Sequence, residues 1–504
     1  MSNTSNLSEE NVLDDLRQQL ADILHVDPMG SRVTGMPAKL ASQDSGNFLL
    51  SRGPEPSQRR QSLPPGVAVS SAPLRTLATP VTTPQGEFLP MAPRSLEEAG
   101  LTESEVESLI LKYLLQARTV SGAEIARQVA LPFTIVEKLL SQMKEYRLVV
   151  YKSISSLHDY VYELTELGSA LGHRCAEQCT YFGAAPVNLK DYAAAVAAQS
   201  IHGLKVKPAD VRKAFSDLTL SEVMQQRVGR AVCSGKGLFL YGAPGNGKTC
   251  IAERITKAYG LTIWIPRALN AFGEIIRLYD PSNHLLLPMS EAGGVLESDK
   301  TDQRWVRIQR PTLVVGGELT LDSLEIRIDS QTGISEAPLQ LKSNCGTLVI
   351  DDFGRQRIAP AELLNRWIVP LEKRYDFLTV ASGRKIQVPF DQFVIFSTNL
   401  EPRDLVDEAF LRRIPYKIDV ADPTEDEFRS LFTTQASEAK VAWAPEDLDY
   451  LIEHCYRTTG RAMRFCHPRD LLHQIAIYWD YLGEPPRLSR ESIEASASNY
   501  FSMV

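Results

Sequence analysis

The segment from residue 238 to residue 259 constrains the fold of this chain more than any other part. An apolar run, 238–241, leads directly into residues 242–249, GAPGNGKT, and a helix-forming stretch follows at 250–259. In a strand, loop and helix of this kind, the glycines allow a tight turn, so that backbone N–H groups and the helix N-terminus face one phosphate chain. The spacing therefore predicts an α/β domain with a parallel sheet that binds a nucleotide at this loop.

The end of the loop supplies two side chains with specific expected roles. Lys248 is expected to reach the β- and γ-phosphates, and the hydroxyl of Thr249 is expected to bind Mg²⁺. The expected nucleotide-binding residues here are Gly242, Ala243, Pro244, Gly245, Asn246, Gly247, Lys248, Thr249 and Cys250.

A second apolar run ends in two acids about a hundred residues further on. Residues 347–350, TLVI, read as a buried strand, and Asp351 and Asp352 follow it. A phosphate-binding loop of this type needs an acid at the end of a second strand to hold Mg²⁺ through water, and we assign this role to Asp351. Asp352 is then expected to polarise the attacking water.

These motifs resemble those of AAA+ ATPases, and further elements of that family follow in the expected order over about residues 205–500. Residues 393–399, FVIFSTN, resemble the sensor 1 strand, which implies that Asn399 lies between the acids and the γ-phosphate. Residues 407–414, DEAFLRRI, resemble the segment that ends in the arginine finger. The resemblance makes Arg413 the first candidate for the finger, because it precedes Ile414, and Arg412 the second.

The resemblance also implies a helical lid and an adenine pocket. Gly460-Arg461 and the stretch 467–472 resemble the start of the sensor 2 helix, with Arg469 as the nucleotide-facing arginine, in a lid that begins at Thr424. The segment 218–234 is expected to line the adenine pocket. Together these elements imply that ATP and Mg²⁺ are the ligands.

Two departures from the common family pattern stand out. The second acid is Asp352, where most remodelling members carry glutamate, which implies slow hydrolysis. The stretch 281–346 is longer than usual and is expected to form an insertion with strands at Thr312–Val315 and Leu324–Ile328. A hairpin expected at Phe377–Val388 is similar to that of Clp, Lon, MoxR-like and enhancer-binding ATPases, which favours a bacterial remodelling subgroup.

The segment Ala271-Phe272-Gly273 is open to two interpretations. It resembles the aromatic-hydrophobic-glycine loop that grips substrate at the pore of AAA+ unfoldases. However, Leu269, Phe272, Ile276 and Tyr279 recur at helical spacing, which favours an amphipathic helix packed on the core.

The remainder of the chain is expected to form separate units. Residues 1–27 read as an amphipathic helix, 28–96 as a disordered Pro/Ser-rich linker, and 97–180 as a winged-helix-like domain. The nucleotide-binding domain then covers 181–423 and the helical lid 424–504. The segment 101–180 carries 8 basic and 10 acidic residues, a net charge of −2, so protein docking is favoured over DNA binding for the winged helix.

Overall composition excludes several classes of protein. A net charge of −8 argues against a chain that coats nucleic acid or an anionic membrane over its whole surface. No signal peptide or membrane-spanning run is evident, which predicts a cytoplasmic protein without membrane insertion. The seven cysteines fit reduced thiols, and His173, Cys175 and Cys179 do not complete a zinc site.

The resulting hypothesis is an ATP-hydrolysing AAA+ protein that remodels a protein client as a homo-oligomeric ring, expected to be a hexamer. Two alternatives remain open. One is a DNA-associated motor or transcription regulator that uses the winged helix. The other is an ATP-gated scaffold that binds nucleotide with little hydrolysis.

Overall fold

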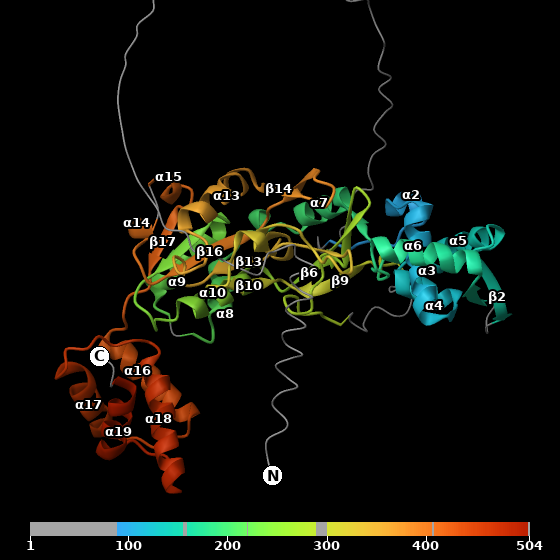
Figure 1. Cartoon of the computed structure of the whole chain (residues 1–504). Helices are drawn as coiled ribbons and strands as arrows, with labels where there is room; N and C mark the ends of the chain where they lie inside the picture. The colour runs from blue at the N-terminus through green and yellow to red at the C-terminus, as the bar shows by residue number, and fades with distance from the viewer. Residues whose placement is uncertain (1–87, 155–158, 219, 289–299, 406–407, 502–504) are drawn as a thin grey trace, which may run out of the picture. The chain divides into compact units, whose positions relative to one another are not determined.

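The computed structural model describes residues 88–154, 159–218, 220–288, 300–405 and 408–501 (Figure 1). The expected helix at 1–27 and the linker up to residue 87 lie outside the described residues. The linker was expected to continue to residue 96, and this is wrong for its last part. Phe88 packs against Trp305 with ring centroids 5.7 Å apart, Met91 forms a β-bridge with Thr301, and helix α2 begins at Leu96.

The first helical unit has the element order of a winged helix. Its three strands form an antiparallel sheet in the order β1-β3-β2. Capping boxes fix the starts of two helices, with Thr102 and Glu105 at α3, and Ser121 and Glu124 at α4. The elements are α2 (Leu96–Ala99), α3 (Glu103–Ala117), β1 (Thr119–Ser121), α4 (Gly122–Val129), α5 (Phe133–Glu145), β2 (Val149–Ile154), β3 (Tyr160–Leu164) and α6 (Glu166–Gln178).

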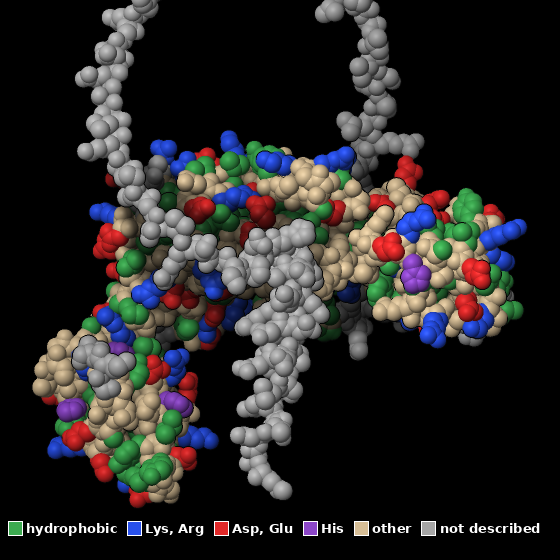
Figure 2. All heavy atoms as spheres, viewed as in Figure 1, with side chains coloured by type: hydrophobic (Ala, Val, Ile, Leu, Met, Phe, Trp, Pro, Cys, Tyr) green, Lys and Arg blue, Asp and Glu red, His purple; other side chains and the backbone are tan. Residues whose placement is uncertain are grey.

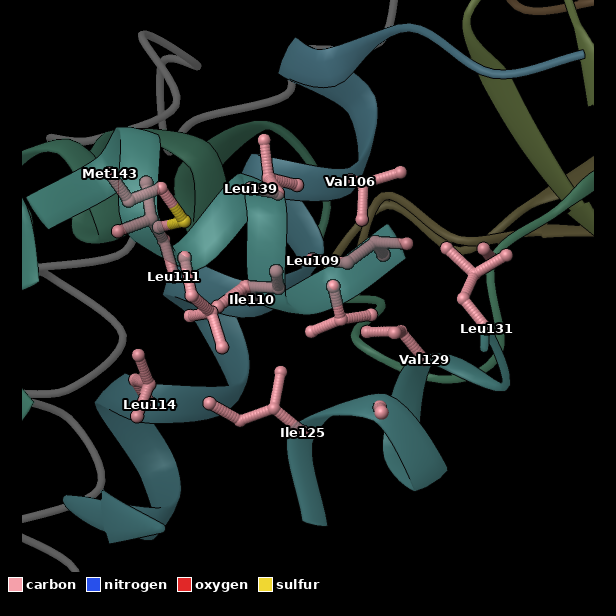
Figure 3. Close-up of a cluster of buried hydrophobic side chains, with 14 of the residues drawn as sticks. Val106, Leu109, Ile110, Leu111, Leu114, Ile125, Val129, Leu131, Leu139 and Met143 are labelled. Atoms are coloured by element: carbon pink, nitrogen blue, oxygen red, sulfur yellow. The ribbon is translucent and has the colours of Figure 1, made fainter. Parts of the chain in front are cut away.

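The periodic apolar residues of these helices meet in one core (Figure 3). Val106, Ile110 and Leu114 of α3 pack with Ile125 of α4 and with Leu139 of α5, and all five are buried. The wing contributes a polar anchor as well. Buried Asp159 accepts hydrogen bonds from the N–H groups of Gly122 and Ala123, at 3.1 and 2.9 Å, and so caps the start of α4.

A five-stranded parallel sheet forms the centre of the next unit, in the order β10-β13-β16-β5-β17. Alternate residues of these strands face two different cores. Leu238, Val349 and Ile395 pack toward α8, α9 and α10, whereas Phe239 and Phe396 pack toward α13. The elements are β5 (Leu238–Tyr241), β10 (Thr312–Val315), β13 (Thr347–Ile350), β16 (Phe393–Thr398), β17 (Tyr416–Asp419), α8 (Pro208–Ala214), α9 (Glu222–Ser234), α10 (Lys248–Ile255) and α13 (Pro360–Lys373).

The assignment of Thr312–Val315 to an insertion is wrong. This run is strand β10 at the edge of the central sheet, paired in parallel with the β13 strand that precedes the two acids. The other expected strand, Leu324–Ile328, is a 3₁₀ turn (Leu321–Leu324) followed by the short strand β11 (Arg327–Ile328). A β-rich run indicates that a strand forms, but its pairing partner depends on distant residues.

Additional strands lie outside the central sheet. They form a second sheet in the order β11-β12-β8-β7-β4 and the antiparallel pairs β6–β9 and β14–β15. The expected hairpin near Phe377–Val388 is confirmed as β14–β15. The bounds are β4 (Val187–Asn188), β6 (Thr262–Pro266), β7 (Ala268–Ala271), β8 (Glu274–Arg277), β9 (Trp305–Gln309), β12 (Ser335–Glu336), β14 (Tyr375–Thr379) and β15 (Lys385–Pro389).

The amphipathic helix favoured around Phe272 is also wrong. Leu269 and Ile276 are cross-strand partners in the β7–β8 hairpin, and both are fully buried. Phe272 and Gly273 form its two-residue turn with φ of 56° and 86°, and Phe272 is 65% exposed. The turn requires positive φ at both positions, which is typical of the tight hairpin turns that match strand twist.

The helices after the central sheet have a core of their own, which includes Phe428, Phe432, Leu451, Ile475 and Trp479. They are α16 (Glu425–Glu438), α17 (Pro445–Ile452), α18 (His467–Leu482) and α19 (Arg490–Phe501), with a π-helical turn at Glu453–Arg457. The remaining helices are α7 (Leu189–Ala198), α12 (Leu339–Lys342), α14 (Pro402–Leu405) and α15 (Glu408–Leu411), with 3₁₀ turns at Ile201–Gly203 and Thr256–Tyr259.

Charge on the surface and the length of the helices can be described for part of the chain. Basic and acidic side chains are intermixed on the visible face (Figure 2). Among the described residues, no helix combines the length and apolar character needed to cross a membrane.

A buried ion pair links the end of α2 to the segment that precedes β9. The Arg304 side chain, 4% exposed, pairs with Asp302 at 2.7 Å and donates to the Ala99 carbonyl at 2.9 Å. We expect Arg304→Met to lower the opening free energy of residues 88–101 and 300–310 by about 3–5 kcal/mol, because Asp302 would stay buried without its partner. Hydrogen exchange measures this change.

The control is Arg277→Met, which breaks the more exposed Arg277–Glu336 pair and should change the opening free energy by less than about 1 kcal/mol. Equal effects of the two substitutions would contradict a special role for the buried pair.

Candidate functional site

The glycine-rich loop connects the end of β5 to the start of α10 at Lys248. Gly245 has φ of 86°, and a Cβ atom there would lie 2.6 Å from the Cys466 sulfur. Gly242 has φ of 133°, and a Cβ atom there would lie 2.6 Å from the Val420 carbonyl oxygen. Both positions therefore require glycine for conformation and for space.

Lys248 is buried at the end of this loop. Its Nζ donates to the carbonyl oxygens of Gly242 and Ala243, both at 3.0 Å, and to Asn399 Oδ1 at 2.7 Å. Burial lowers the pKa of Lys248, and the nearby Asp351 and Asp352 carboxylates oppose that shift. The ammonium group thus lies among the ends of β5, β13 and β16.

Two further contacts join the other expected residues. The hydroxyl of Thr249 donates to Asp351 Oδ2 at 2.7 Å, and Asn399 Nδ2 donates to Asp352 Oδ1 at 3.1 Å. The structure therefore brings together Lys248, Thr249, Asp351, Asp352 and Asn399. Sequence reasoning missed Gln356, whose amide donates to the backbone carbonyls of Asp351 and Asp352 at 2.8 and 3.1 Å.

The Thr249 hydroxyl and the Asp351 carboxylate fit the needs of Mg²⁺. Both are hard oxygen donors, and Mg²⁺ is commonly held by one or two such protein groups together with water and phosphate oxygens. Within the part of the chain that the structure describes, no group of three or more His, Cys, Asp or Glu residues could hold a metal.

A cavity of about 890 Å³ is lined by the loop and by apolar and polar side chains of other elements. The start of the segment expected to line the adenine pocket does line it, through Leu218, Leu220 and Met224. Leu431 and Gln435 of α16 also line the cavity. Sequence reasoning missed these two residues, because α16 shows only the apolar spacing of a core helix.

The lid also contributes to the loop region. Arg469 lines the cavity, but its side chain is 72% exposed and pairs with Asp470 at 2.9 Å. Asp422 accepts a hydrogen bond from Asn246 Nδ2 at 2.7 Å and pairs with Arg464. Arg464 was not predicted, although its place between Gly460 and the α18 helix in the expected sensor 2 segment was a usable signal.

The two expected finger arginines do not line this cavity of their own chain. Arg413 donates to Glu372 Oε1 at 2.7 Å, and its side chain is 19% exposed. Arg412, one residue earlier, is exposed. The two arginines therefore differ in their surroundings: Arg413 is mostly buried and paired with Glu372, whereas Arg412 is exposed.

The sheet order and the site together define the class of fold. A parallel sheet with a phosphate-binding loop after β5 and acids after β13 has the fold of a P-loop NTPase. With Asn399 at the end of the intervening β16 strand and a helical unit after β17, the fold is the AAA+ form of that class.

Residues 424–499 match a family described as "Domain of unknown function (DUF8689)". No curated protein matches the chain. Its fold is similar to a crystal structure of NtrX from Brucella abortus, at 15% identity and TM-score 0.37 over 58% of this chain and 57% of that one. A mutant form of RuvB from Thermotoga maritima matches at 12% identity and TM-score 0.31 over 61% of this chain and 74% of that one.

At these TM-scores the similarity adds nothing to the fold assignment, which rests on strand order and loop geometry. The chain spans little more than half the length of the NtrX structure.

Proposed function

We propose that this protein binds ATP with Mg²⁺ and hydrolyses it. The observation that supports this best is the connected set of side chains at the ends of three neighbouring strands. Lys248 contacts Asn399, Asn399 contacts Asp352, and Thr249 contacts Asp351. This arrangement combines a phosphate-binding cation, a metal-binding pair and an acid that can orient water.

Each residue has a distinct proposed part in the reaction. Lys248 binds the β- and γ-phosphate oxygens in place of the loop carbonyls that it now contacts. Asp352 accepts a hydrogen bond from the attacking water, and Asn399 holds the Asp352 carboxylate in position. Bound Mg²⁺, held at Thr249 and Asp351, would neutralise developing phosphate charge. Aspartate reaches less far than glutamate, so hydrolysis is proposed to be slow.

Substitutions of Lys248 and Asp352 should have different effects. Lys248→Ala removes charge-assisted contacts with phosphate, so we expect the Kd for MgATP to rise by about 100-fold. Asp352→Asn should leave Kd within about twofold and reduce turnover by at least about 100-fold, because the group acts on water. Equilibrium binding and phosphate-release assays measure both quantities.

A carboxylate outside the site provides the matched control. Asp404 is exposed and does not line the cavity, and Asp404→Asn should change neither quantity. Equal affinity of the wild type and Lys248→Ala would overturn the assignment of the loop. Binding by the wild type with no measurable turnover would favour the scaffold alternative.

We propose further that the protein works as a homo-oligomeric ring, a hexamer, in which an arginine enters the site of the next subunit. Arg413 remains the first candidate and Arg412 the second. Glu372, which contacts Arg413 at 2.7 Å, is proposed to position the guanidinium of Arg413 for this role. The alternative is that the Arg413–Glu372 pair is a weak structural salt bridge with no part in catalysis.

Mixing two inactive variants tests the finger. Arg413→Ala should lower turnover by about 1000-fold with little change in Kd, because a finger acts on the transition state. Mixed with Lys248→Ala, which retains the arginine, it should regain activity above either variant alone. Full activity of Arg413→Ala, together with loss and mixed recovery for Arg412→Ala, would transfer the role to Arg412.

The protein client is proposed to contact two hairpin tips that lie together. Arg384 of the β14–β15 turn lies 5.2 Å from the Phe272 ring centre, and Ala381 N–H donates to Glu274 Oε2 at 2.7 Å. The exposed Phe272 supplies an apolar contact for an unfolded segment. Strand β15 leads into β16, which ends at Thr398, one residue before Asn399, so the tips have a short connection to the proposed nucleotide site.

Phe272→Ala should reduce stimulation of ATP hydrolysis by an unfolded model polypeptide, casein, at least about fivefold and leave basal turnover unchanged. Phe377→Ala removes an exposed aromatic ring on β14, away from the turn, and serves as the control. Unchanged stimulation of Phe272→Ala would contradict the client contact. Salt-dependent binding of duplex DNA by the full chain, weakened by Arg147→Glu, would instead favour the DNA-associated alternative.

A further inference from the structure

The turn that carries Asp352 has an uncommon backbone conformation. Asp352 has φ of 49°, in the left-handed region that residues other than glycine seldom adopt. Aspartate tolerates this region better than most residues, but the conformation persists only where the surrounding structure holds it. Gly354, two residues later, has φ of 104°. The direction of the Asp352 side chain therefore depends on the contacts that keep this turn in its observed form.

One side chain, that of Gln356, makes three hydrogen bonds within the turn. Its Nε2 donates to the carbonyl oxygens of Asp351 and Asp352, at 2.8 and 3.1 Å. Its Oε1 accepts a hydrogen bond from the Gly354 N–H at 2.8 Å. The reverse orientation of the amide would place its oxygen against two carbonyl oxygens and its nitrogen against an N–H group. The Gln356 side chain therefore matches the polar groups of the turn in one orientation only.

The same turn is joined to strand β16. The Phe353 N–H donates to the Ser397 carbonyl oxygen at 2.7 Å, which fixes the residue after Asp352 to the sheet. Asn399, which follows β16, contacts the Asp352 carboxylate at 3.1 Å. Rotation of the peptide groups on either side of Asp352 would move this carboxylate relative to Asn399. The hydrogen bonds from Gln356 to the carbonyl oxygens of those peptide groups oppose the rotation.

We propose that Gln356 is a positioning residue, which holds Asp352 in the conformation that orients the attacking water. This inference rests on the proposed ATP hydrolysis and adds a residue that governs its rate. Asp352 and Asn399 line the cavity, whereas Gln356 is not among the described residues that line it, so Gln356 acts through Asp352. A displacement of about 1 Å in a group that positions a reactant can slow a reaction by about 100-fold.

Two substitutions of Gln356 in the full chain test the proposal. Gln356→Met keeps a similar length and removes the amide, whereas Gln356→Glu keeps an acceptor for the Gly354 N–H and loses both donors. Each should lower the single-turnover rate of MgATP hydrolysis at least about tenfold and leave the Kd for MgATP within about twofold. Gln128→Met is the matched control, because Gln128 on α4 also donates from Nε2 to a backbone carbonyl, that of Phe182 at 3.0 Å. It should change neither quantity.

A combined variant separates positioning from an independent effect on the reaction. Asp352→Asn removes the group through which Gln356 is proposed to act. Adding Gln356→Met to Asp352→Asn should therefore slow hydrolysis by less than about twofold more. If the two losses multiply instead, Gln356 does not act through Asp352 and the positioning role is overturned.

The outcomes also distinguish this inference from the proposed function. If the wild type binds no ATP or releases no phosphate, both fail. If the wild type hydrolyses ATP but either Gln356 variant retains its rate, or if both variants lose affinity for MgATP, the proposed hydrolysis stands and the role of Gln356 is overturned.

Discussion

The buried ammonium group of Lys248 is the interaction on which the rest of the site depends. A cation with so little exposure must be surrounded by acceptors, and the loop carbonyls and Asn399 supply them. These contacts join the end of β5 to the end of β16, and Asn399 extends the connection to Asp352 after β13. The order of the central sheet, which places β16 between β5 and β13, makes this connection possible. In the proposed function, phosphate oxygens replace these carbonyls as acceptors for the Lys248 ammonium group.

The lid meets this loop through a second polar group. Asp422 binds Asn246 of the loop and Arg464 near the start of α18, and the Cys466 N–H donates to the Gly245 carbonyl at 2.9 Å. Burial is the main cause of the lowered pKa of Lys248, and repulsion by the positive charge of Arg464 lowers it further. These contacts place charged side chains of the residues after β17 beside the glycine-rich loop.

Sequence analysis could predict those parts of the site that are formed by residues close together in the sequence. The loop and the acid pair each follow an apolar strand, and a parallel sheet brings such strand ends to one edge. Pairing partners are not local, which is why Thr312–Val315 was assigned to an insertion although it pairs with β13. Phe272 shows another limit, because apolar residues three and four apart also arise in a hairpin with a tight turn. Gln435 comes to line the cavity only when α16 packs beside it, and no spacing in the sequence records that approach. Arg464 lies in the expected sensor 2 segment, which was a usable signal, but its pairing with Asp422 is not local and could not be predicted.

The central claim is that the Lys248 site binds a nucleotide triphosphate and promotes its hydrolysis, and a single-turnover experiment on the unmodified full chain tests it most directly. Limiting γ-labelled ATP is incubated with excess protein, with Mg²⁺ or with a chelator, and free phosphate is followed over time. The proposed chemistry predicts stoichiometric ADP and phosphate, formed slowly and only with Mg²⁺. Labelled ATP that stays unbound, or that binds and is recovered intact with Mg²⁺ present, would contradict it.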